Sequence, residues 1–355
     1  MHKRIKSERF IWLDITITLL ALELMAYFYY GPRTLVTAGI CIAVSLAAEL
    51  VALRLMHKKF RADNLSCTSD ALITALMLPA AIDMKIPAIA CIIAVTAAKN
   101  IFGGKNNMIF SPAAVAYLIM YTSWKNDLLS YTAPHTKTGI FEAASELVNS
   151  ASYTYNHTGS FKATDFELLL GNFSGPVGAV SILLLTVSAL ILILRRDISA
   201  GAFCGSITGT VFMAVICPIY GSSADSVKYI LATNMILFAS IYIISDKRIA
   251  PKGNYYAFFY GLFIALSSYV ITLTTGKENV IIIMSVLFTP VSLGFKNLQK
   301  WIDNERLSEA EAKVAAEADS IAGLPLNETE TDNPEVITDS SAKSGSEFEE
   351  TAENE

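Results

Sequence analysis

Ten apolar segments, separated by short polar stretches, follow one another along most of the chain. They cover residues 10–30, 34–54, 69–81, 86–101, 110–123, 174–194, 198–218, 226–244, 255–274 and 279–295. Most of them reach the length of about 20 residues that a helix needs to cross a bilayer. The pattern predicts an all-α polytopic membrane protein with about ten transmembrane helices.

The third and fifth segments are too short for a complete span. Short or Pro/Gly-interrupted segments are typical of broken or re-entrant helices that line a site inside the membrane. Ten spans also divide into two sets of five, and repeats with an odd number of spans must have inverted topology. Pro112 and Pro290 in the fifth and tenth segments, and Asp70 and Asp246 in the third and eighth, favour such a five-plus-five inverted repeat.

Composition agrees with a membrane protein, because 53% of the residues are hydrophobic and only 17% are charged. Residues 303–355 carry 16 acidic and 3 basic residues, so the rest of the chain has a net charge of +8. This acidic segment is too polar to fold alone, and we expect disorder after a short helix. The predicted regions are a cytoplasmic N-terminus (1–9), two transmembrane halves (10–123 and 166–301), an extracytoplasmic loop (124–165) and an acidic cytoplasmic tail (302–355).

Lysine and arginine placement predicts the orientation, since cytoplasmic loops carry an excess of both. With the N-terminus inside, the inside segments are rich in Lys and Arg, whereas the short outside loops hold only Arg33, Lys85, Lys228 and Lys277. We therefore expect a multi-pass protein of the bacterial cytoplasmic membrane with both termini inside. The five cysteines have no CxxC spacing and the four histidines form no HxxxH pair, so the sequence predicts no metal site.

Three polar islands interrupt the apolar pattern, at residues 97–119, 168–181 and 69–81. In the first, Gly103 and Gly104 allow a close backbone approach, and asparagines can satisfy the backbone groups of a broken helix. One interpretation is a tight cytoplasmic turn between two helices. The other is an internal site, which the presence of three such islands favours.

Three acidic residues fall within or at the start of predicted spans, namely Glu23, Glu49 and Asp70. Ionisable groups in a bilayer are costly and usually face a cavity or a partner. They predict either a cation path or structural pairs with Ser, Thr or Lys on neighbouring helices.

The islands together resemble the RnfD/NqrB family, whose members are membrane subunits of Rnf-type electron transport complexes and of the sodium-translocating NADH:quinone reductase. The most specific match to its motifs is the set Lys99, Phe102, Gly103, Gly104, Asn107, Phe110, Pro112 and Ala113. Further matches are Ala71, Leu72, Thr74, Leu78 and Pro79, then Gly171, Asn172, Gly175, Gly178 and Ser181, then Asp246, Pro251 and Gly253. The resemblance covers roughly residues 10–300 in the correct order.

The resemblance implies a membrane subunit of an ion-translocating oxidoreductase complex that is not catalytic alone. It implies electron transfer through flavin between ferredoxin and NAD, coupled to Na+ or H+ transport, with Fe–S and other flavin subunits as partners. It also implies a covalent FMN on a threonine of an S/T-G-A-T motif before the sixth span, and a second flavin such as riboflavin. Cofactor-binding candidates are then Lys99, Gly103, Gly104, Asn107, Phe110, Gly171, Asn172 and Asp246.

The chain departs from the family at the flavin acceptor. Thr138 and Gly139 align with the start of the motif, which puts Phe141 at the acceptor position. Phenylalanine has no hydroxyl and cannot form a phosphoester. Thr132, Thr136 and Thr138 are the nearby alternatives. Two other functions therefore stay open, a solute transporter built on the same inverted repeat and a flavin-free scaffold subunit.

Overall fold

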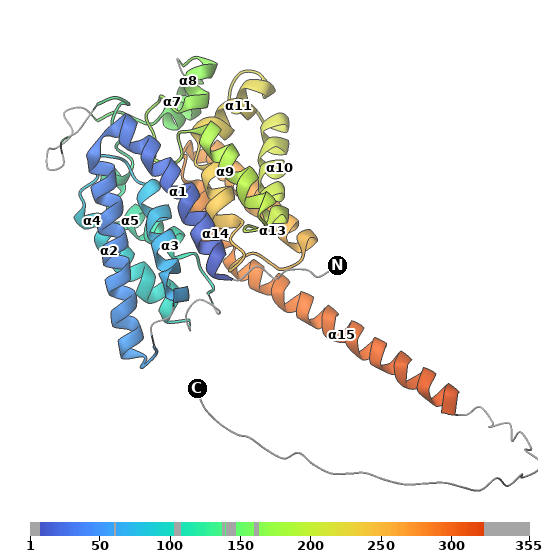
Figure 1. Ribbon diagram of the computed structural model, residues 1–355. Coiled ribbons are helices and arrows are strands. Elements are labelled where there is room, and N and C mark those ends of the chain that lie inside the picture. Colours follow the sequence, from blue (N-terminus) through green and yellow to red (C-terminus); the bar gives the residue numbers. More distant parts are fainter. Residues whose placement is uncertain are drawn as a thin grey trace, which may run out of the picture. The chain divides into compact units, whose positions relative to one another are not determined.

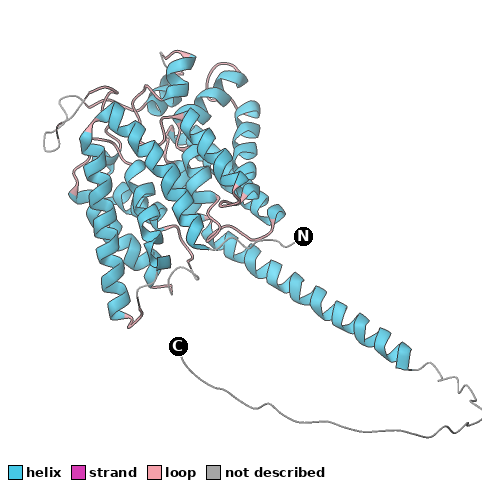
Figure 2. Cartoon of the chain, in the orientation of Figure 1, coloured by secondary structure: helices cyan, strands magenta, loops and turns pink. Residues whose placement is uncertain are grey.

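Helices account for nearly all of the regular structure in the chain (Figure 2). The computed structural model describes residues 8–59, 62–102, 108–136, 139, 147–159 and 163–322. Within these ranges no strand forms, and a single antiparallel bridge pairs Tyr131 with Val148. The predicted all-α class is confirmed.

The first five apolar segments fold as helices, which run from the blue to the cyan end of the ribbon in Figure 1. They are α1 (Glu8–Tyr30), α2 (Pro32–Leu55), α3 (Ser66–Leu76), α4 (Lys85–Ala94) with the π-helix η2 (Val95–Asn100), and α5 (Pro112–Ser123). A 3-10 turn, η1 (Ala62–Leu65), leads into α3. Proline stands at the first position of α2 and of α5, where its missing N–H leaves no helical hydrogen bond unmade.

The second five segments fold in the same manner. They form α9 (Ile182–Leu194), α10 (Ala200–Ile216), α11 (Ser223–Thr233), α12 (Ile236–Ala239) with the π-helix η4 (Ser240–Ile244), α13 (Asn254–Thr275), α14 (Val280–Leu287) and α15 (Thr289–Ala322). The predicted extracytoplasmic loop is partly helical, with α6 (Lys125–Leu128) and α7 (Ala151–Thr158), and α8 (Asp165–Leu170) follows. The chain forms two compact units, residues 1–302 and 303–355. The helical part of the predicted tail extends to Ala322.

Two predicted segment ends were wrong. The third apolar segment was expected to run to residue 81, but its helix stops at Leu76, shortly before Pro79. The sixth was expected to begin at residue 174, but α9 begins at Ile182. Residues 171–181 are irregular although several are apolar, because Gly175, Pro176 and Gly178 disfavour a helix.

Several membrane-depth helices are broken or locally widened. Within the described residues, three helices are long and apolar enough to cross a bilayer, namely Ile11–Tyr30, Pro32–Leu55 and Asn254–Thr275. Two bent pairs could each form one further span, with a 62° bend between α11 and Ile236–Ile244 and a 43° bend between α14 and α15. The remaining predicted spans are helical but shorter. The π-helices η2 and η4 occupy the fourth and eighth segments, and such elements are frequent at functional sites.

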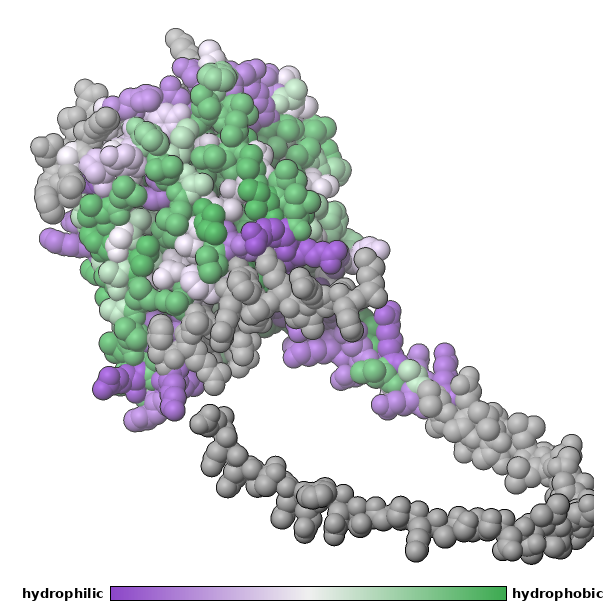
Figure 3. Space-filling view, viewed as in Figure 1, coloured by the Kyte–Doolittle hydropathy of each residue, from purple (hydrophilic) through white to green (hydrophobic). Residues whose placement is uncertain are grey.

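The helical body exposes apolar side chains over its flanks. Large hydrophobic residues of α1 and α9 are more than half exposed, among them Ile17, Leu24, Phe28, Leu190 and Leu194. Figure 3 shows hydrophobic residues across the middle of the body and hydrophilic residues toward its two ends. A soluble protein rarely exposes apolar patches of this extent, whereas a bilayer covers them. The chain is a multi-pass membrane protein.

Helices α10 and α13 pack with their backbones in contact, through glycines on both. A Cβ atom added to Gly205 would lie 2.0 Å from the Phe258 carbonyl oxygen, and one added to Gly261 would lie 2.2 Å from the Ala202 carbonyl oxygen. Small residues at helix interfaces allow such approach inside membranes, where van der Waals packing drives association. In the first half of the chain, α2 also packs on α4 and η2.

We expect Gly205→Ala to destabilise the protein by about 1–3 kcal/mol, the usual range for overpacking a close contact. The added methyl group cannot fit against the Phe258 carbonyl unless the two helices separate. Thermal unfolding of the purified chain in detergent measures the effect. Gly39→Ala in α2 is the matched control, since a Cβ there meets nothing within 4 Å. Equal unfolding temperatures for the two variants would contradict the packing argument.

Candidate functional site

Arg248 holds one carboxylate from each half of the protein. Its guanidinium donates to both oxygens of Asp70 in α3, at 3.0 and 2.5 Å, and its Nε donates to Asp246 Oδ2 at 2.8 Å. Asp70 and Asp246 are only 3% and 8% exposed. Charge-assisted bonds of this two-pronged geometry are among the strongest in proteins. The two acids that the sequence analysis placed in corresponding segments therefore meet on one cation.

Local backbone geometry presents Arg248 to both acids. The chain turns sharply after η4, and the Asp246 carbonyl accepts the amides of Ile249 and Ala250 at 3.0 and 2.8 Å. Asp246 Oδ1 also accepts the Arg248 amide at 2.9 Å, which fixes the arginine backbone beside the carboxylate. Lys296 in α15 donates to the Arg248 carbonyl at 3.1 Å. The turn, α3 and α15 are thus joined around one buried charge cluster.

A second buried ion pair joins two residues that the sequence analysis had assigned to different roles. Lys99 Nζ lies 3.0 Å from Glu49 Oε1, and both side chains are at most 2% exposed. Glu49 also accepts from Asn64 Nδ2 at 3.0 Å and from Asn100 Nδ2 at 3.1 Å. Lys99 and Asn100 are adjacent residues of η2, and both lie buried on the side that faces Glu49 in α2. The π-helix therefore brings two neighbouring polar side chains to one carboxylate.

The three predicted ion-path acids have different environments. Glu49 and Asp70 are neutralised by Lys99 and Arg248. Glu23 in α1 is 2% exposed, and its Oε1 has no hydrogen-bond partner. No ion pair among the described residues includes Glu23. The cation path stays a prediction, and Glu23 is its uncompensated member.

Two polar islands dock on each other. The amides of Val177 and Gly178 donate to the carbonyls of Leu78 and Leu76 at 3.1 and 2.7 Å, which satisfies acceptors at the end of α3. A Cβ on Gly178 would lie 2.5 Å from the Leu76 Cβ, so the contact requires glycine. The irregular segment 171–181 therefore caps the end of the third apolar segment.

Gly171 and Asn172, two predicted cofactor-binding residues, begin this loop. Gly171 ends α8 with a φ of +90°, a left-handed conformation that favours glycine. The amides of both residues donate to the Glu167 carbonyl at 2.9 Å. The Asn172 Oδ1 atom is buried without a partner. The structure thus gives Gly171 a role in ending α8. The Asn172 side-chain oxygen has no hydrogen-bond partner and is therefore free to accept one from a ligand.

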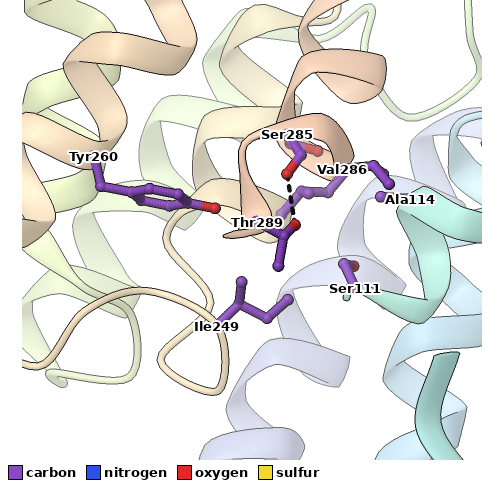
Figure 4. A pocket seen from close by; sticks show the side chains of 8 residues that line it. Ser111, Ala114, Ile249, Tyr260, Ser285, Val286 and Thr289 are labelled. Atoms are coloured by element: carbon purple, nitrogen blue, oxygen red, sulfur yellow. Dashed lines mark hydrogen bonds between the residues drawn. The ribbon is translucent and has the colours of Figure 1, made fainter. Parts of the chain in front are cut away.

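A small pocket lies between the two halves (Figure 4). It is lined by Ser111 and Ala114 of the first half and by Ile243, Ile249, Tyr260, Ser285, Val286 and Thr289 of the second, and the space among these side chains, part of it open to solvent, is about 190 Å³. In the figure the Tyr260 hydroxyl points toward Ser285 and Thr289. Pockets for organic ligands usually enclose about 300–1,000 Å³. This one is too small for a flavin ring.

Sequence reasoning missed Arg248 and Glu278. Arg248 follows Asp246 in the run Ser245-Asp-Lys-Arg248, which signals a basic loop but not its partner. Glu278 lies in the short loop between α13 and α14 and accepts hydrogen bonds from Tyr131 and Ser150. Burial raises the pKa of the Glu278 carboxyl, and these two hydrogen bonds oppose the rise. A lone acid in a short loop gave no signal of this environment.

Comparison with known proteins identifies the family. The model described as the NQR2, RnfD, RnfE family matches residues 1–293, which is well over half of the chain. The chain belongs to this family. The resemblance noted from the motifs is confirmed.

Curated relatives in the family are 24–32% identical to this chain over the aligned residues. A subunit of the Na(+)-translocating ferredoxin:NAD(+) oxidoreductase complex of Acetobacterium woodii is 28% identical over 56% of this chain and 62% of its own length. A subunit of the ion-translocating oxidoreductase complex of Shewanella frigidimarina is 32% identical over 31% of this chain and 32% of its own length. Its counterpart in Pseudomonas aeruginosa is 24% identical over 70% and 78%. The chain thus spans less than two thirds of the first two.

The candidate acceptor threonines differ in their access to solvent. Thr132 is 2% exposed, and its hydroxyl has no hydrogen-bond partner. Thr136 is exposed and donates to the Ala133 carbonyl. Phe110 packs edge-on against Phe102, with ring centroids 5.8 Å apart. Thr138, Gly103, Gly104 and Asn107 lie outside the described residues. Because an attaching enzyme must reach its acceptor, buried Thr132 does not fit a covalent FMN.

Proposed function

We propose that this chain is the membrane-embedded subunit of an Rnf-type complex that passes electrons between ferredoxin and NAD through flavin. The complex couples electron transfer to transport of Na+ or H+, and its partners are further membrane subunits and Fe–S and flavin subunits. The family match over residues 1–293 carries the proposal. The chain alone is not a catalyst, since its sequence holds no Fe–S or nucleotide motif.

The arrangement of buried charge supports a role in coupling. Arg248 joins Asp70 of one half to Asp246 of the other, so a relative movement of the halves would separate or rearrange these charges. Buried ion pairs are sensitive to such rearrangement, because an unpaired charge in a low-dielectric interior is costly. A subunit that moves ions needs a charged element with two arrangements, and this cluster is suited to that role.

The proposal is tested by removing the chain from a host that carries the remaining subunits. We expect ferredoxin-dependent NAD reduction by the membranes to be lost and to return when the chain is supplied on a plasmid. Coupled ion uptake by inverted vesicles should return with it. Full activity without the chain would contradict the proposal.

A second candidate role, a subunit that carries no covalent flavin, is favoured by two observations. The motif alignment puts Phe141 at the acceptor position, and Thr132 is buried. In-gel flavin fluorescence of the denatured chain, co-expressed with a flavin-transferase, decides between the roles. A fluorescent band with FMN mass on a peptide containing Thr136 or Thr138 would establish a covalent carrier. A dark band would assign the chain a scaffold role or a non-covalent flavin such as riboflavin.

We further propose that the protein lies in the cytoplasmic membrane with both termini inside. The positive-inside bias of its loops supports this orientation. Lys300 is exposed in α15, so a cysteine introduced there can be labelled from solution. We expect a membrane-impermeant thiol reagent to label Lys300→Cys only in opened cells. Labelling of intact cells would contradict the orientation.

A further inference from the structure

Three lysines share one surface where the turn after η4 meets α15. Lys296 in α15 donates to the Arg248 carbonyl at 3.1 Å, which ties the lysine to that turn. Lys252 follows on the same turn, and Lys300 lies one helical turn further along α15. Both lie within electrostatic range of the Lys296 ammonium. The turn and α15 therefore bring three positive charges to one place.

Packing between the two elements fixes this arrangement. Ser292 in α15 is buried and donates to the Ile249 carbonyl. The rings of Phe295 in α15 and Tyr256 in α13 pack together with their centroids 6.1 Å apart. The lysines are thus attached to a docked part of the helical body, so their positions relative to one another are set by the fold.

The positive charge of this cluster is not balanced within the described part of the chain. No ion pair among the described residues includes any of the three lysines. The nearby acids Asp70 and Asp246 already share Arg248. Lys296 and Lys300 are four residues apart on one helix, a spacing at which like charges repel. Four cations therefore meet two acids, and an anion from outside the chain would balance the excess.

Exposed apolar side chains border the lysines. Tyr255 at the start of α13 is 84% exposed, and Trp301, next to Lys300 in α15, is 61% exposed. Leu298 in α15 is also exposed. Because α13 is long enough to cross a bilayer, its first residues lie near the membrane surface. Tyrosine and tryptophan are enriched at that level, where their rings lie among lipid headgroups.

We propose that Lys252, Lys296 and Lys300 form a binding site for the phosphate group of an anionic phospholipid. Basic sites at the ends of transmembrane helices bind such headgroups. A free phosphate ion would balance the charge but leave Tyr255 and Trp301 uncovered, so the surface fits a lipid better. The inference goes beyond electron transfer and does not depend on it. A lipid bound here would lie beside the ion pairs through which Arg248 joins the two halves.

The test is the response of the purified full-length chain to lipids of different charge. Thermal unfolding is followed in a neutral detergent with added phosphatidylglycerol or phosphatidylcholine. A ligand that binds only the folded state raises the unfolding temperature in a saturable manner. We expect this rise with phosphatidylglycerol and a smaller one with phosphatidylcholine.

Two double variants with the same loss of charge give the comparison. In Lys252→Gln, Lys300→Gln the phosphatidylglycerol concentration at the midpoint should rise by about tenfold, since each lysine near an anionic headgroup strengthens binding several-fold. Lys85→Gln, Lys125→Gln is the matched control, because both lysines are exposed and lie on other elements, α4 and α6. The control should respond like wild type.

Trp301 provides a second measurement that does not depend on stability. In a chain with Trp12→Phe and Trp124→Phe, its fluorescence reports on lipids that carry bromine, a quencher, in their acyl chains. At equal mole fractions we expect stronger quenching by brominated phosphatidylglycerol than by brominated phosphatidylcholine. The lysine double variant should lose this preference.

Three results would overturn the proposal. Equal responses of wild type to the two lipids would leave an anionic surface of a partner subunit as the occupant. Stabilisation by inorganic phosphate that phosphatidylglycerol does not exceed would make the site one for a free anion. A lysine double variant that responds like its control would show that these lysines do not bind the lipid. None of these measurements involves ferredoxin or NAD, so failure here is distinguishable from failure of the electron-transfer function.

Discussion

Arg248→Met is expected to lower the free energy of unfolding by about 3–5 kcal/mol, the range for removing one partner of a buried ion pair. The substitution leaves Asp70 and Asp246 without their shared cation, and both are nearly inaccessible to water. The same variant removes the link between α3 and the turn after η4. We therefore expect lower yields of monodisperse protein and a lower unfolding temperature.

Two further variants separate charge from geometry at this position. Arg248→Lys keeps the positive charge but loses the two-pronged donor, so an intermediate unfolding temperature is expected. Lys252→Met is the matched control, since Lys252 is an exposed cation four residues further on. Adding Asp70→Asn to Arg248→Met should restore part of the lost stability, because one uncompensated charge disappears. An Arg248→Met protein as stable as the control would contradict the argument that Arg248 stabilises the protein by pairing with Asp70 and Asp246.

Lys99→Met is the second substitution with a large expected effect, about 3 kcal/mol of destabilisation by the same mechanism. Glu49 would keep its bonds from Asn64 and Asn100 but lose the only cation within reach in the described structure. The unfolding temperature of the purified chain measures the loss. Lys85→Met is the control, because Lys85 is exposed at the start of α4, the helix that continues into η2.

The double variant Lys99→Met, Glu49→Gln tests whether charge balance is the cause. Replacing both members of a buried pair by neutral residues is often close to neutral for stability, so the double variant should be more stable than Lys99→Met alone. If both variants lose the same stability, then the packing of the Lys99 side chain, and not its charge, stabilises η2. Such a result would remove the electrostatic interpretation of this cluster.

The apolar pattern was sufficient to predict the helical class and the places of the helices. Hydrophobic runs report directly on burial in lipid or protein, and a chain in lipid must satisfy its backbone by forming helices. The apolar pattern did not predict where the helix of the third segment ends or where the helix of the sixth segment begins. Residues 77–81 and 171–181 contain apolar side chains, but their prolines and glycines favour another backbone, and the two segments dock through the bonds from Val177 and Gly178 to Leu78 and Leu76.

The sequence by itself identified several of the charged residues that lie buried, and the tertiary structure decided what each of them contacts. Asp70, Asp246, Lys99 and Glu49 were all identified from the chain, because charged residues within apolar runs stand out. Their partners could not be predicted, since Asp70 and Arg248 are 178 residues apart and pairing depends on how helices pack. Glu278 shows the limit most clearly. A single acid in a short loop looks solvated in the sequence, and only the packing of α5, α7 and the loop around Tyr131 removes it from water.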